Sequence, residues 1–97
     1  MNKYYHIFIR PNYDVSLSKV ESIMSLALDW FRYDNNCYIV YSSSSTDQLL
    51  KRFHPIVSNG NIFISEINIK NINGFMPEAF CNWIYKRKQE WLTEFPG

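Results

Sequence analysis

Aromatic and basic side chains alternate near the C-terminal end of the chain, in a pattern suited to binding. Trp83, Arg87 and Trp91 recur at intervals of four residues, and Lys86 and Lys88 flank the arginine. On a helix this spacing places the three residues on one face, where tryptophans can stack on bases and cations can neutralise phosphates. The basic run can instead complement the helix dipole, and a core-facing stripe is formed by Phe80, Ile84, Trp91 and Leu92, so both interpretations stay open.

Residue patterns that would specify a reaction are missing from the sequence. The two histidines, His6 and His54, are distant, and the four serines at 42–45 lack the glycines of a nucleophile elbow. No glycine-rich phosphate-binding motif occurs. Cys37 and Cys81 are not part of a C-x-x-C pair, which favours reduced core thiols over zinc ligands. We therefore assign no catalytic residue, metal or cofactor; the sequence favours a non-enzyme and leaves a divergent nuclease open.

Charge and length place further bounds on function. Ten Lys plus Arg against nine Asp plus Glu give a net charge of +1, so the bulk charge does not favour nucleic acid or membranes. A chain of 97 residues, 46% hydrophobic and 18% aromatic, suits one domain over 1–97. The N-terminus has no secretory leader and no apolar run is long enough to cross a bilayer. We expect a cytoplasmic protein without membrane association.

Hydrophobic periodicity predicts an α+β domain. The order is strand, helix, strand, strand, helix, strand, which is the ferredoxin-like β-α-β-β-α-β pattern with an additional C-terminal helix. Both faces of the first strand are apolar, so we expect the C-terminal helix or a second subunit to cover the outer side of the sheet. Strands are expected over 3–10, 29–33, 37–42 and 61–69, and helices over 15–28, 46–54 and about 77–92.

Local signals predict both ends of the second helix. Ser45 and Gln48 have the spacing of a capping box, in which each side chain bonds the other residue's backbone N–H. Pro55 disfavours helical geometry at the residue before it. The second helix is therefore expected to end near His54.

Three stretches of the sequence carry a family resemblance: YYHIFIR at 4–10, CYIVYSSSSTDQLLKRF at 37–53, and NIFISEINI with the following GFMPEAFCNWIYK. They resemble the CRISPR adaptation nuclease-like and VapD-like family of small ferredoxin-like proteins, in particular its SinR-like branch. The resemblance implies a ferredoxin-like fold and a homodimer.

The same resemblance raises the question of a metal site. In the nuclease members an aspartate ends the first strand and, with its copy from a second subunit, holds a divalent metal. The corresponding position here is Arg10, whose guanidinium would repel a cation that needs oxygen ligands. Asp14, four residues later, either substitutes for that aspartate or caps the first helix.

Three functional hypotheses follow. The first is a non-catalytic homodimer that binds a protein or nucleoprotein partner, encoded on a mobile element and acting on a host defence complex. The second is a nucleic-acid binder or divergent metal-dependent nuclease of the resembled family, with Arg10, Lys86, Arg87 and Lys88 on phosphates. The third, implied by the VapD-like resemblance, is a component of a toxin–antitoxin module.

Overall fold

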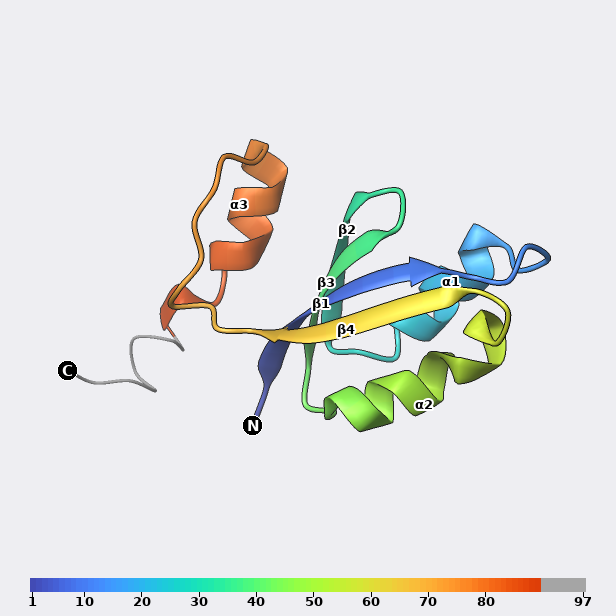
Figure 1. The fold of residues 1–97 in the computed structure, drawn as a ribbon. Helices are drawn as coiled ribbons and strands as arrows, with labels where there is room; N and C mark the ends of the chain where they lie inside the picture. Colours follow the sequence, from blue (N-terminus) through green and yellow to red (C-terminus); the bar gives the residue numbers. More distant parts are fainter. Residues whose placement is uncertain (90–97) are drawn as a thin grey trace. The chain divides into compact units, whose positions relative to one another are not determined.

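The computed structural model describes residues 1–89 and shows one four-stranded antiparallel sheet in the order β2-β3-β1-β4 (Figure 1). This is an α+β fold with a ferredoxin-like arrangement, as the sequence predicts. The elements are β1 (Lys3–Arg10), α1 (Leu17–Met24), β2 (Asp29–Asp34), β3 (Cys37–Ser42), α2 (Thr46–Val57), β4 (Asn61–Ile67) and α3 (Glu78–Tyr85).

The chain divides into two compact units. The first, Met1–Ile67, contains the whole sheet with α1 and α2, and the second, from Asn68 onward, contains α3. In the first unit, α1 and α2 lie on the same face of the sheet (Figure 1).

The hydrophobic core of the first unit fills the space between the sheet and its two helices. Strand residues alternate between the two faces of a sheet, so every second residue of β1 points to this core. Ile7 of β1 is fully buried. The remaining core residues come from β1, β3 and both helices: Ile9, Val20, Met24, Tyr38, Val40, Phe53, Ile56 and Val57.

The sheet register fixes which residues lie on the opposite, outer face. β1 is central and pairs antiparallel with β3 on one side and with β4 on the other. Because Ile7 and Ile9 face the helices, the intervening positions face outward. The outer-face residues of β1 are Tyr4, His6, Phe8 and Arg10.

The first helix is shorter than the predicted range of 15–28, because α1 ends at Met24. The backbone N–H of Leu28 donates to the carbonyl of Tyr41 on β3 at 3.0 Å. This bond requires residues 25–28 to leave the helix and turn toward the sheet. Leu28 is consequently 60% exposed, although its spacing in the sequence suggested a core position.

Serine side chains cap both helices of the first unit. Ser16 accepts from the backbone N–H of residue 19 at 3.2 Å, so it caps α1 and Asp14 does not. Ser45 and Gln48 form the predicted capping box at α2, with bonds of 3.1 Å and 2.8 Å. The capping role of Asp14 is thus wrong, whereas that of Ser45 is confirmed.

The second helix continues past the predicted end at His54. α2 contains Pro55 and ends at Val57. The proline lacks one helical N–H, but Ile56 and Val57 are 5% and 7% exposed, and their burial favours one further half-turn against the core. Among residues 1–89, no helix is long and apolar enough to cross a bilayer.

The helix of the second unit begins as expected and ends early. Pro77 is the N-cap of α3, and Glu78 lies in its first turn, where a carboxylate complements the helix dipole. α3 ends at Tyr85, and residues 86–87 form a turn, so the helix does not run unbroken to residue 92. The predicted continuation over 90–92 lies outside the described residues.

Candidate functional site

Aromatic side chains cluster on the outer face of the sheet. The register places Tyr41 of β3 beside Tyr4 of β1, and Phe63 of β4 beside Phe8 of β1. On β2, Phe31 lies beside Ile39 of β3. The outer-face aromatic residues are Tyr4, Phe8, Phe31, Tyr33, Tyr41 and Phe63. Such side chains supply large contact areas at little cost in conformational entropy, so they suit an interaction surface.

The two ends of the outer face differ in exposure. Tyr4 and Tyr41, with ring centroids 4.9 Å apart, are 3% and 8% exposed. At the other end Phe63 is 63% exposed and Phe8 is half-buried. The Arg10 guanidinium lies 5.2 Å from the centroid of the Phe8 ring, a cation–π distance. Phe63 is therefore the most exposed of these outer-face aromatic residues, and the half-buried Phe8 lies beside it.

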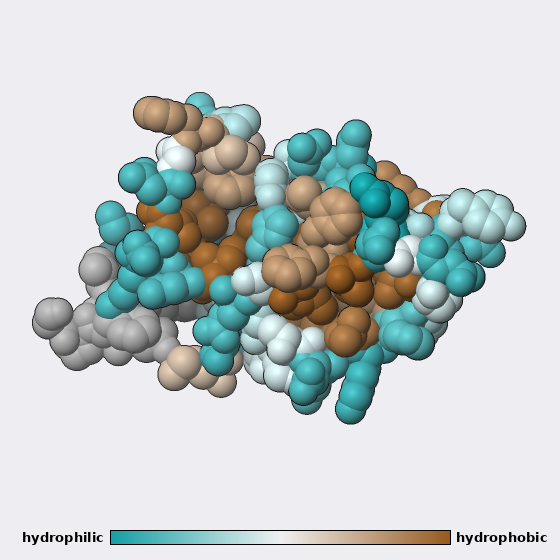
Figure 2. All heavy atoms as spheres, viewed as in Figure 1, coloured by the Kyte–Doolittle hydropathy of each residue, from teal (hydrophilic) through white to brown (hydrophobic). Residues whose placement is uncertain are grey.

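This surface continues around the edge of β4. A shallow cavity of about 210 Å³ lies between β4 and α2, and Leu50 beside it is 42% exposed. Figure 2 shows apolar side chains gathered over β4, with hydrophilic ones around them. We define the β4 patch as Phe8, Leu50, Ile62, Phe63 and Ile64.

A hydrogen-bonded pair of titratable groups lies in the middle of the outer face. His6 Nε2 is 2.5 Å from the Tyr33 hydroxyl. Burial lowers the pKa of His6, which favours a neutral ring that accepts the Tyr33 proton. Burial, followed by a hydrogen bond with Cys37, raises the pKa of Tyr33 to about 12. Near neutral pH the His6 ring is therefore neutral and the Tyr33 hydroxyl is protonated.

The second histidine does not join this cluster. His54 belongs to α2, which packs on the opposite face of the sheet from His6. The fold therefore does not bring the two histidines together as an acid–base pair. Cys37 and Cys81 are both free, but each is half-buried and neither belongs to the core, so the prediction of core thiols is wrong in that part.

Arg10 is the last residue of β1. Arg10 is exposed, and its Nη1 donates to Asn61 Oδ1 at 3.5 Å. Asp14 is exposed in the following loop. Among residues 1–89, no three His, Cys, Asp or Glu side chains come together as a metal-binding group.

The predicted basic and aromatic cluster gathers around Trp83 in the second unit. Lys86 Nζ and Arg87 Cζ lie 5.6 Å and 5.9 Å from the Trp83 ring centroid. Trp83 and Arg87 are half-buried, whereas Lys86 and Lys88 are exposed. The turn at 86–87 replaces the helical stripe that the four-residue spacing suggested. Trp91 lies outside the described residues.

Sequence reasoning missed the β4 patch because it placed the binding surface on the last helix. The signal was present in the alternation of β4, where Phe63 and Ile67 lie on one face and Ile62 and Ile64 on the other. What the alternation could not show is that β4 lies at an edge of the sheet.

No family model, curated protein or solved structure matches this chain.

Proposed function

We propose that this chain is a small non-catalytic interaction protein of the CRISPR adaptation nuclease-like and VapD-like kind, which forms a homodimer and binds a protein or nucleoprotein partner. The observation that carries the proposal is the exposed β4 patch on an edge strand. Apolar aromatic surface beside a strand edge favours association with another strand or apolar surface.

The two edges of the sheet support assigning the interface to β4. β2, at one edge, carries Asp29, Arg32 and Asp34 and has an irregular register between the last two, features that oppose pairing. β4, at the other edge, has seven residues, no lysine or proline, and Glu66 as its one charged residue. Within residues 1–89, β4 pairs with β1 alone. Its outer edge therefore offers unpaired backbone donors and acceptors.

A second copy of the chain is the partner that this edge suits best. Two β4 strands related by a two-fold axis would pair antiparallel and extend the sheet across both copies. The register places Arg10 beside Asn61 at one end of β4, and Glu66 lies near the other end. Because Glu66 already pairs with Lys3 of the same chain at 3.2 Å, the two ends add no strong charge attraction between copies. A net charge of +1 per chain adds little repulsion.

Two matched lysine variants test this interface. Light scattering measures the mass of each variant in solution. Phe63→Lys places like charges at the proposed two-fold contact, and Leu26→Lys adds the same charge in the loop after α1. Phe63 and Leu26 are 63% and 66% exposed, so neither change removes core packing. We expect a monomer for Phe63→Lys and a dimer for Leu26→Lys. Equal masses for the two variants would exclude β4 from the interface.

Nucleic acid is the alternative ligand of the outer face. Phe8 and Phe63 lie side by side with the Arg10 guanidinium over Phe8. An aromatic pair beside a cation on a four-stranded sheet is suited to stacking on single-stranded bases. Binding of labelled RNA and DNA across a salt series distinguishes this alternative, because phosphate contacts weaken as salt rises. Cleavage that requires magnesium would support the nuclease version.

The proposed partner is decided by what co-purifies with the tagged protein from its own host. A host defence complex in the eluate supports the mobile-element hypothesis. A protein encoded by the neighbouring gene, together with growth arrest when one of the two is expressed alone, supports a toxin–antitoxin module.

A further inference from the structure

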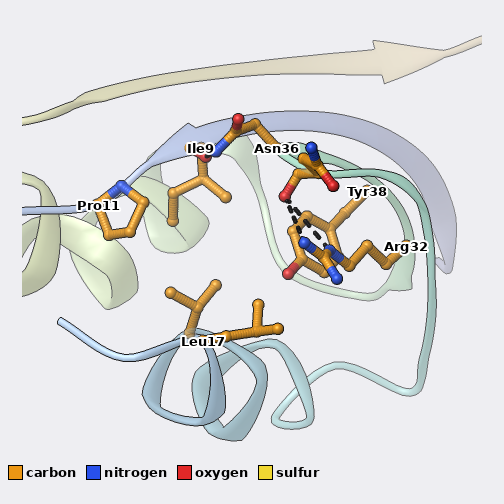
Figure 3. Close-up of a pocket in the computed structure, with 8 residues that line it drawn as sticks. Ile9, Pro11, Leu17, Arg32, Asn36 and Tyr38 are labelled. Atoms are coloured by element: carbon orange, nitrogen blue, oxygen red, sulfur yellow. Dashed lines mark hydrogen bonds between the residues drawn. The ribbon is translucent and has the colours of Figure 1, made fainter.

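A pocket of about 270 Å³ lies on the core side of the first unit, between α1 and the β2–β3 hairpin (Figure 3). Ile9, Leu17 and Val20 form its apolar wall, and Arg32, Asn36 and Tyr38 are its main polar residues. Among the described residues, Arg32 is the one charged residue that lines it. The pocket is slightly smaller than the usual range of about 300–1,000 Å³ for ligand sites, and its walls combine apolar surface with few polar groups, as ligand sites do.

Within residues 1–89, the buried Tyr38 hydroxyl has no hydrogen-bond partner. The side chain is 1% exposed, and its ring packs on Trp30 with centroids 5.8 Å apart. Figure 3 shows the hydroxyl at the side of the pocket that faces α1, next to the Arg32 guanidinium. A buried hydroxyl without a partner is costly and uncommon in folded proteins. Its presence at a pocket that contains a guanidinium points to a ligand oxygen.

The hairpin holds Arg32 in place at this pocket. Arg32 Nε and Nη2 donate to the carbonyl of Asn35 at 3.3 Å and 2.9 Å, which leaves Nη1 outside these two bonds. Asn36 bonds the backbone of Ile9 twice, at 2.8 Å through its side chain and at 2.9 Å through its carbonyl. These bonds fix the hairpin against β1, so the donors are positioned before a ligand arrives.

The protonation state of the Tyr38 hydroxyl allows it to donate a hydrogen bond. Burial raises the pKa of the Tyr38 hydroxyl, the charge of Glu21 raises it further, and that of Arg32 opposes the shift. The hydroxyl is therefore protonated at neutral pH and can donate to an anion. Two adjacent donors, one of them charged, match the two oxygens of a carboxylate.

We propose that this pocket binds a small carboxylic acid with a branched aliphatic body. The carboxylate accepts hydrogen bonds from the Tyr38 hydroxyl and from Arg32 Nη1, and the aliphatic body packs on Ile9, Leu17 and Val20. A phosphate fits less well, because its additional oxygens would face this apolar wall without donors. The pocket lies on the opposite side of the sheet from the outer face, so this site is independent of the proposed dimer interface.

Chemical-shift titration of the full chain with isovalerate tests the proposal. We expect saturable shifts at the backbone amides of Ile9, Leu17, Val20 and Asn36. Isovaleramide has the same shape without the charge. Its affinity should be lower by roughly tenfold or more, because hydrogen bonds to charged groups are the stronger ones. N-acetyl-leucine serves as a second probe that resembles a peptide C-terminus. Tighter binding of N-acetyl-leucine than of isovalerate would indicate a peptide C-terminus, and the reverse order would indicate a free acid. No saturable shift with either acid, or equal affinity for isovaleramide, would overturn the proposal.

Three variants separate a binding role from a structural one. Tyr38→Phe removes only the unpartnered oxygen, so the free protein should keep its melting temperature or gain a little, while isovalerate affinity falls roughly threefold or more. Arg32→Gln should weaken isovalerate by roughly tenfold or more. Arg52→Gln is the matched control, because Arg52 does not line the pocket. Its Nη2 donates to the Ser44 hydroxyl at 3.1 Å. A Tyr38→Phe protein that loses stability and keeps its isovalerate affinity would show a structural hydroxyl and contradict the site.

Discussion

Phe8 of β1 lies directly opposite Phe63 of β4 on the outer face of the sheet. Phe63 is 63% exposed, whereas Phe53 of α2 is 1% exposed in the core. Phe63→Ala should therefore cost about 1 kcal/mol of unfolding free energy or less, the scale of a cross-strand pair. Phe53→Ala should cost about 3–5 kcal/mol, because it leaves a cavity. Urea denaturation of both variants measures the contrast, and equal losses would show that Phe63 is a core residue.

The burial of His6 makes stability depend on pH. Burial lowers the pKa of His6 below its ordinary 6.5, so the unfolded chain binds a proton more readily than the folded one. The contribution of neutral His6 to the free energy of unfolding is complete above about pH 6.5. It decreases as the pH falls toward the pKa of His6 in the folded protein. We expect the urea midpoint to drop between pH 7.5 and 5, and this drop to shrink in His6→Asn. A midpoint that falls equally in both proteins would assign the pH dependence to other groups.

Within the serine run at 42–45, Ser45 caps the second helix. Ser45 accepts from the backbone N–H of Gln48 at 3.1 Å, and the Gln48 side chain bonds the Ser45 N–H. Ser45→Ala should destabilise the protein by about 1 kcal/mol through loss of the N-cap. Ser43→Ala, two residues earlier, should change stability by less than about 0.5 kcal/mol. Thermal unfolding compares them, and a larger loss in Ser43→Ala would contradict the assignment.

Gly60 is required by the close approach of the turn before β4 to the end of β1. A Cβ at position 60 would lie 2.1 Å from the carbonyl oxygen of Arg10, a backbone atom that cannot move away alone. Gly60→Ala should cost about 1–3 kcal/mol, as overpacking does. Asn59→Ala is the neighbouring control and should change the unfolding free energy by less than about 0.5 kcal/mol. A Gly60→Ala protein as stable as the unmodified chain would show that the turn can move.

The sequence predicts those parts of the fold that depend on neighbouring residues. Strand alternation and the spacing of Ser45 and Gln48 are local signals, and they located the strands and the start of α2. The continuation of α2 past Pro55 depends on burial of Ile56 and Val57, which only the assembled core determines. The same holds for the candidate sites, because neither the edge position of Phe63 nor the proximity of Arg32 to Tyr38 can be deduced without the sheet order.

Sedimentation equilibrium of the unmodified full chain, from low to high micromolar concentration, tests the central proposal most directly. Association through the β4 edge predicts that the mass rises with concentration from the 11.6 kDa of one chain to twice that value. Phe63→Lys should stay at the lower mass over the same range. A mass that remains at 11.6 kDa for the unmodified chain at the highest concentration would contradict the proposed homodimer.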